Sequence, residues 1–277
     1  MCSVNSFEKF VAAISAEMET PALYGWFHLL FVALVIGLTV FLCLRLRDAE
    51  ERTVRRLMLA VFAVMVTVEA YKQLVFSMTV VDGAAVWSYT WYAFPYQLCS
   101  TPIYVLPFAA LLPEGRCRDA AIAYLSSFAL FGGLAVMVYP GDVFIGMIGI
   151  NLQTMIHHGL QVVLGIYLLV RYRGRQLHRH FVGAVVVFLI LLAVALALDI
   201  GVYHALSARY EEVPSFNMFY ISPYFPCTLP LVSLIYAAVP YAVFLLIYIV
   251  GFVLAAAVMH YGGRGIIRLA GKRHEKK

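Results

Sequence analysis

Charged residues are scarce in this sequence. Asp, Glu, Lys and Arg fill only 13% of the 277 positions, whereas a soluble domain carries about a quarter of such residues. Hydrophobic residues make up 63% of the chain. This composition excludes an ordinary water-soluble domain and predicts an integral membrane protein that crosses the bilayer several times.

Paired cysteine motifs are also missing. No two of the five cysteines stand in a CxxC arrangement, so a zinc ribbon or a dithiol redox site is not expected. We therefore expect neither a metal ion nor a cofactor. The net charge of +5 does not indicate a nucleic-acid partner, because the basic residues cluster in short segments next to the apolar stretches.

Seven apolar stretches approach the roughly 20 residues that a membrane span requires. The fold class predicted is thus all-α, a single domain over residues 1–277 built as a seven-transmembrane helix bundle. The last stretch is long, and we expect one tilted span that bends near Pro230 or Pro240. The predicted spans are residues 22–44, 57–80, 93–112, 120–139, 147–170, 181–205 and 228–256.

The basic residues predict the orientation of the bundle. They follow the first span, precede the fourth, separate the fifth from the sixth, and fill the tail after the seventh, whereas segments 82–92 and 140–146 have none. The positive-inside rule then places the N-terminus outside and the C-terminus in the cytoplasm. The arginine-rich loops favour a bacterial plasma membrane. Trp26, Trp87 and Trp91 fall at the outer interface, and residues 5–18 are expected to form a short interfacial helix.

Polar side chains recur at one depth of the predicted bundle. At 1.5 Å per residue, several of them lie roughly 20–25 Å from the cytoplasmic edge, in the outer half of the membrane. Ionisable groups at such a depth usually face a partner or a wet cavity. Four spans therefore deliver polar or reactive groups to one predicted site: His28, Glu69, Lys72, Cys99, His157 and His158.

Glu69 and Lys72 are three residues apart, so they share a helix face and are expected to form an ion pair. This pair is either a self-neutralising structural element or the lining of a polar cavity. Cys99 lies between Pro95 and Pro102, where the helix must open locally. Its thiol is either a small apolar filler or a reactive group facing that cavity.

The adjacent histidines His157 and His158 point about 100° apart on a helix, so they cannot serve one partner equally. A thiol and an imidazole at matching depth predict a nucleophile and its general base. Acyl transfer through a thioester would follow, with a lipid as the acyl donor. Gln97, Asn217 or nearby backbone amides are candidate donors to the oxyanion. The apolar segment 216–224 is expected to fold over the outer mouth of this site, or to lie flat at the interface.

Several of these residues together resemble the YwaF-like family of integral membrane proteins. The resemblance rests on His28, the Glu69-x-x-Lys72 pair, Pro95-Tyr96-Gln97-Leu98-Cys99, His158-Gly159 and Asn217-Met218-Phe219. That family includes the eukaryotic transmembrane protein 164, a phospholipid acyltransferase, and is distantly similar to the androgen-inducible-type threonine hydrolases.

The resemblance implies an acyl-enzyme mechanism. It assigns the nucleophile to Cys99 and the base to His158, with His157 as the alternative. In the hydrolase branch the nucleophile is a threonine, and Ser100 and Thr101 follow Cys99 here, but Cys99 fits the acyltransferase pattern better. The expected partner is a phospholipid or another acyl lipid; the acyl chain, the acceptor and the oligomeric state are left open.

Three other functions compete with the acyltransferase. A lipid ester hydrolase would use the same site with water as the acceptor. A transporter or lipid-handling protein would use Glu69 and Lys72 to line a pathway. Metal or haem binding by His28, His157 and His158 ranks last, because their spacing matches no ligand motif.

Overall fold

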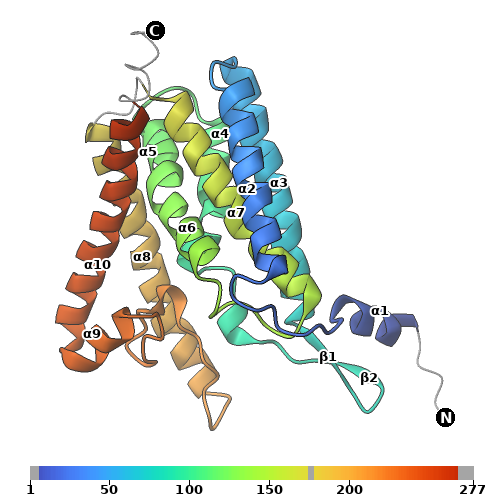
Figure 1. Cartoon of the computed structure of the whole chain (residues 1–277). Helices are drawn as coiled ribbons and strands as arrows, with labels where there is room; N and C mark the ends of the chain where they lie inside the picture. Colours follow the sequence, from blue (N-terminus) through green and yellow to red (C-terminus); the bar gives the residue numbers. More distant parts are fainter. Residues whose placement is uncertain (1–5, 174–177, 268–277) are drawn as a thin grey trace.

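The computed structural model describes residues 6–173 and 178–267, which form a bundle of long helices (Figure 1). Six of these helices are long and apolar enough to cross a membrane. The prediction of a multi-pass, mainly helical membrane protein is therefore confirmed. The six are α2 (Trp26–Arg45), α3 (Glu51–Val75), the continuous run of α5 (Arg116–Tyr124), η3 (Leu125–Ala129) and α6 (Leu130–Val138), α7 (Ile148–Arg171), α8 (His178–Ser207), and the run that begins with α10 (Tyr241–Ala257) and η5 (Val258–Gly262) and ends at Ile267.

The third predicted span, residues 93–112, is not one continuous helix. A short turn, η1 (Trp91–Ala93), is followed by extended backbone, then by η2 (Leu98–Ser100) and α4 (Pro102–Leu111). Pro95 and Pro102 explain the interruption, because each lacks the N–H that a continuing helix needs. The apolar helix Leu98–Leu111 is shorter than the six spans, so the seven-span count is not confirmed.

The last predicted span, 228–256, was placed too early in the chain. A separate short helix, α9 (Val232–Ala238), ends before Pro240, and the long helix starts only at Tyr241. The break at Pro240 was one of the two predicted positions. Because the helix runs from Tyr241 to Ile267, its centre lies about three helical turns beyond the predicted one.

A β-hairpin replaces the predicted end of the second span. The helix α3 stops at Val75, and β1 (Met78–Val81) pairs with β2 (Ala84–Trp87) in antiparallel register. The turn between them is Asp82-Gly83, with both φ angles positive at 51° and 79°, as a two-residue hairpin turn of type I′ requires. The N-terminal helix α1 (Ser6–Ile14) packs against this hairpin.

The helix α7 is the centre of the bundle and has the largest buried share of the six spans. It packs against α2, α3 and α6. Gly133 permits the close approach of α6, because a Cβ there would lie 2.8 Å from Cβ of Gln161 and 2.8 Å from the carbonyl oxygen of His158. Gly159 plays the same role toward α2, where a Cβ would lie 2.7 Å from Val35.

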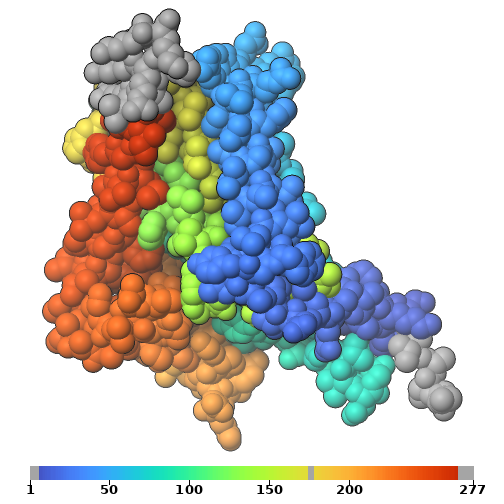
Figure 2. Space-filling view, in the orientation of Figure 1, coloured from blue at the N-terminus to red at the C-terminus, as the bar shows by residue number. Residues whose placement is uncertain are grey.

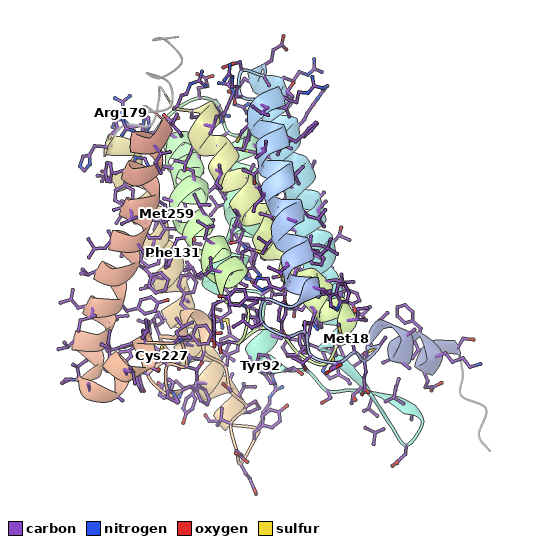
Figure 3. The ribbon with its side chains drawn as sticks, in the orientation of Figure 1. Met18, Tyr92, Phe131, Arg179, Cys227 and Met259 are labelled. Carbon is purple, nitrogen blue, oxygen red and sulfur yellow. The ribbon has the colours of Figure 1, made fainter. Side chains whose placement is uncertain are left out.

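Apart from Arg209, the described basic loop residues gather at one end of the bundle, where Figure 3 shows Arg179, whereas Met18, Tyr92 and Cys227 lie toward the other end. Glu51 at the start of α3 binds the buried Arg118 and accepts a hydrogen bond of 2.8 Å from Tyr172. Six of the basic residues used to predict the orientation lie outside the described residues: Arg175, Arg268, Lys272, Arg273, Lys276 and Lys277.

Candidate active site

The backbone around Cys99 leaves regular helix geometry. The carbonyl oxygen of Leu98, which loses its helical donor at Pro102, accepts a hydrogen bond of 2.6 Å from the Thr101 hydroxyl. The same hydroxyl lies 2.6 Å from the phenol oxygen of Tyr124 on α5. These bonds stabilise an open turn inside the bundle, as irregular backbone at membrane depth requires.

Two side chains of α7 hold the backbone of Cys99. The carbonyl oxygen of Cys99 accepts a hydrogen bond of 2.8 Å from Nε2 of His157 and another of 2.9 Å from Nε2 of Gln161. These two residues are one helical turn apart, so they present their donors to the same point. The structure thus brings the predicted cysteine and histidine segments into direct contact, from positions 58 residues apart in the chain.

The hydrogen bonds of the two histidines define their tautomers. Nδ1 of His158 donates to the carbonyl oxygen of Thr154 at 2.7 Å, which leaves Nε2 unprotonated in the neutral ring. His157 has the opposite tautomer, because its Nε2 donates to Cys99 and its Nδ1 carries the lone pair. Both rings are buried, with centroids 5.5 Å apart, and each unprotonated nitrogen is without a hydrogen-bond partner.

Glu69 and Lys72 form the predicted ion pair, with Nζ and Oε1 2.8 Å apart. The Gln73 amide also donates to Oε1 at 2.8 Å. The pair lies within electrostatic range of both Cys99 and His158. The structure therefore places a cation and a carboxylate close enough to influence the charge of the thiol and of the His158 imidazole.

Four buried side-chain atoms of this region have no hydrogen-bond partner, and they are of one chemical kind. In the tautomers above, all of them are hydrogen-bond acceptors. Buried acceptors are ordinarily satisfied by protein, water or ligand. Cys99 and Lys72 are half-buried rather than fully enclosed. The atoms are Oε2 of Glu69, Nδ1 of His157, Nε2 of His158 and Oε1 of Gln161.

A buried segment, residues 216–222, crosses next to this site; we refer to it as the strap. Gln97, two residues before Cys99, holds the strap with both ends of its carboxamide. Its Oε1 accepts from the backbone N–H of Phe219 at 2.8 Å, and its Nε2 donates to the carbonyl oxygen of Asn217 at 2.8 Å. The Asn217 side chain closes the strap on itself by accepting from the N–H of Ser222 at 2.8 Å. The carboxamides of Gln97 and Asn217 therefore hold the strap in its conformation.

The sequence interpretation missed Asp199, a fully buried carboxylate on α8. Its Oδ1 accepts a hydrogen bond of 2.7 Å from the backbone N–H of Met218 in the strap, and its Oδ2 has no hydrogen-bond partner. The two residues after Met218, Phe219 and Tyr220, have positive φ angles of 57° and 58°, which bulky residues rarely adopt without support from the surrounding structure. A lone acidic residue within the apolar run 181–205 was the available signal.

His28 has a separate place in the fold. Its Nε2 donates to the carbonyl oxygen of Met137 at 2.9 Å, and its Nδ1 accepts from the backbone N–H of Tyr24 at 3.2 Å. Its ring also contacts Phe144. Both nitrogens are thus engaged in joining α2 to the end of α6, and the structure does not group His28 with Cys99.

The arrangement offers a thiol, two neutral imidazoles and an ion pair in one region. The Cys99 sulfur is not hydrogen-bonded to the free nitrogen of either imidazole, because both of these nitrogens lack a partner. Catalytic hydrogen bonds are often longer in empty sites and tighten when substrate binds. No cluster of three or more His, Cys, Asp or Glu side chains suited to a metal occurs among the described residues.

Comparison with known proteins gave one family. A model of the TMEM164 family matches residues 23–262, which include every side chain of the site. No curated protein and no solved structure matches the chain. The match spans the bundle from the start of α2 to the end of η5.

Proposed function

Since the chain belongs to the TMEM164 family of membrane proteins, we propose that it is a lipid acyltransferase that carries the acyl group on Cys99. The observation that supports this most directly is the contact of Cys99 with α7. Two α7 side chains hold the Cys99 carbonyl, and the adjacent His158 keeps an unprotonated nitrogen buried without a partner. A cysteine becomes a nucleophile when such a base accepts its proton.

In the first half-reaction, Nε2 of His158 accepts the thiol proton, and the sulfur attacks the ester carbonyl of an acyl lipid. The carbon–sulfur bond forms, the ester carbon–oxygen bond breaks, and the imidazolium returns its proton to the departing alcohol. In the second half-reaction, His158 takes a proton from an acceptor hydroxyl, whose oxygen attacks the thioester. The acyl group moves to the acceptor, and the thiolate leaves and regains its proton.

The other polar groups fit auxiliary roles in this reaction. His157 positions Cys99 through its carbonyl, and it is the alternative base. Lys72 lies within electrostatic range of Cys99 and stabilises negative charge on the thiolate and the oxyanion. Gln97 and Asn217, predicted as oxyanion donors, instead act as positioning residues because their carboxamides hold the strap.

We also propose that the short helix Leu98–Leu111 completes a seventh crossing, together with the extended residues before it. Its 14 residues span only about 21 Å as helix, less than the roughly 30 Å hydrocarbon layer. Figure 1 draws α1 and the C-terminal end of the helix that begins at Tyr241 at opposite ends of the bundle, as an odd number of crossings between them requires. The basic end is then cytoplasmic, and Cys99 lies toward the outer leaflet.

The test is acyl transfer by the purified protein in phospholipid vesicles. The vesicles contain a phospholipid with an isotope-labelled acyl chain and an unlabelled lysophospholipid acceptor. We expect labelled chains on the acceptor and loss of transfer in Cys99→Ala. Transfer should be retained in the matched control Cys43→Ala, which changes a cysteine near the C-terminal end of α2.

Two other outcomes would overturn the acyltransferase assignment. Release of labelled fatty acid without transfer would assign the site to a lipid hydrolase. Lipid movement across the bilayer that survives Cys99→Ala and is lost in Glu69→Gln would assign it to a carrier.

A further inference from the structure

The helix α1 and the β1–β2 hairpin project sideways from the bundle, at the end opposite the basic residues. Figures 1 and 2 show them beyond α2 and α3, at the level where several spans begin. We refer to α1 and the hairpin together as the paddle. A hydrogen bond of 2.6 Å from the Tyr71 hydroxyl to the carbonyl oxygen of Ile14 joins it to α3. The N–H of Met18 binds the carbonyl oxygen of Gly146 at 3.1 Å, so the paddle has a fixed place on the bundle.

The paddle presents apolar side chains outward. Each of them is more than a third exposed, and Trp87 is 71% exposed. The strand register places Val80 and Trp87 on one face of the hairpin and Val81 and Val86 on the other. A two-stranded hairpin is only marginally stable in water, so a hairpin with apolar side chains on both faces is stabilised by an apolar environment. The exposed apolar residues of the paddle are Phe7, Phe10, Val80, Val81, Val86 and Trp87.

The charges at this end of the molecule limit the kind of partner. Lys9 and Arg209 are the basic residues there, and the acidic residues outnumber them. An anionic lipid surface or a nucleic acid would be repelled rather than attracted. Aromatic and aliphatic side chains without excess positive charge suit the headgroup layer of a zwitterionic bilayer. The acidic residues are Glu8, Glu17, Glu19, Asp82, Asp142, Glu211 and Glu212.

We propose that the paddle docks in the headgroup layer of the leaflet at this end of the bundle, by inserting its apolar side chains. The membrane-spanning helices already place the paddle at the bilayer surface, so the lipid surface continues from the bundle onto the paddle. The paddle sets the depth at which the adjoining bundle meets the lipid headgroups.

The docked hairpin is also connected to the candidate active site. Trp87 stacks on Tyr89, with ring centroids 6.2 Å apart. The Tyr89 hydroxyl donates to Oε1 of Gln73 at 2.8 Å, and the Gln73 amide donates to Glu69 at 2.8 Å. Burial, with the charge of Glu69 acting in the same direction, raises the pKa of Tyr89 to about 12, so Tyr89 remains a donor at physiological pH. Two hydrogen bonds thus join the lipid-facing hairpin to the ion pair.

The test uses fluorescence of a single tryptophan in the full-length protein, reconstituted in phosphatidylcholine vesicles. Trp26→Phe with Trp91→Phe leaves Trp87 as the only emitter. The matched control, Trp87→Phe with Trp91→Phe, leaves Trp26 at the start of the first span as a reference for the interface. We expect Trp87 to lose emission to a lipid that carries a nitroxide near its headgroup, as strongly as Trp26 does, and to do so equally at low and high salt.

Two results would overturn the proposal. Quenching of Trp87 by aqueous iodide but not by the lipid nitroxide would mean that the paddle projects into water. Protection of Trp87 from both quenchers would mean that a protein, such as a second copy of the chain, covers the paddle.

Discussion

Replacing Lys72 with methionine is expected to destabilise the protein by about 3–5 kcal/mol, because the Glu69 carboxylate would remain buried without its cation. The ammonium and carboxylate are 2.8 Å apart, and their side chains are only 16% and 8% exposed. At an effective dielectric constant of about 20, charges at this distance attract each other by about 6 kcal/mol. Desolvation of both groups offsets much of that attraction.

Removing both charges should cost far less than removing one. In Glu69→Gln with Lys72→Met, no unpaired charge remains, and we expect a free energy of unfolding within about 1 kcal/mol of the unmodified protein. Titration of a denaturing detergent into mixed micelles, followed by circular dichroism, measures these free energies. A loss below about 1 kcal/mol for Lys72→Met alone, the value typical of exposed pairs, would refute the reasoning and mean that water screens the pair.

Three further predictions concern the surroundings of Cys99. His158→Gln should abolish acyl transfer, whereas His157→Gln should leave a slower reaction, since it removes a bond to the Cys99 backbone; the reverse order in a vesicle transfer assay would make His157 the base. Asp199→Leu should destabilise the protein by about 1–3 kcal/mol, because it leaves the Met218 N–H of the strap unpaired. Asp199→Asn should cost less, because the asparagine keeps an acceptor for that N–H. Equal losses of unfolding free energy in detergent for the two variants would contradict this. Gly133→Ala should cost about 1–3 kcal/mol through overpacking of α6 on α7, and an unchanged unfolding free energy together with unchanged transfer would contradict it.

The long spans could be predicted because their apolar runs leave no other stable placement than the bilayer. The region around Cys99 could not, since a hydropathy window averages over Pro95 and Pro102 and reports one span where the chain forms an extended segment and a short helix. The hairpin was missed for a similar reason. Most of its first strand, Met78 to Val80, was taken as the end of the second span, although Asp82-Gly83 is a strong turn signal.

The depth argument identified several residues that the fold brings together, and it also had limits. Cys99 and His157 meet, and the Glu69–Lys72 pair lies within electrostatic range of Cys99, because equal depth on neighbouring helices allows this. Depth carries no information on rotation about the helix axis, so His28 was grouped with them although it faces Met137. Asp199 binds a segment 19 residues further along the chain, and no periodicity in the sequence reveals such a contact.

Mass spectrometry of the protein itself shows whether Cys99 carries the acyl group. The protein is incubated with an acyl phospholipid without acceptor, quenched in acid, digested, and the peptide containing Cys99 is weighed. We expect an added acyl mass on Cys99 that neutral hydroxylamine removes, because the bond is a thioester. In His158→Gln this added mass should not form. An unmodified Cys99 in a protein that still transfers acyl chains when acceptor is supplied would contradict the proposal.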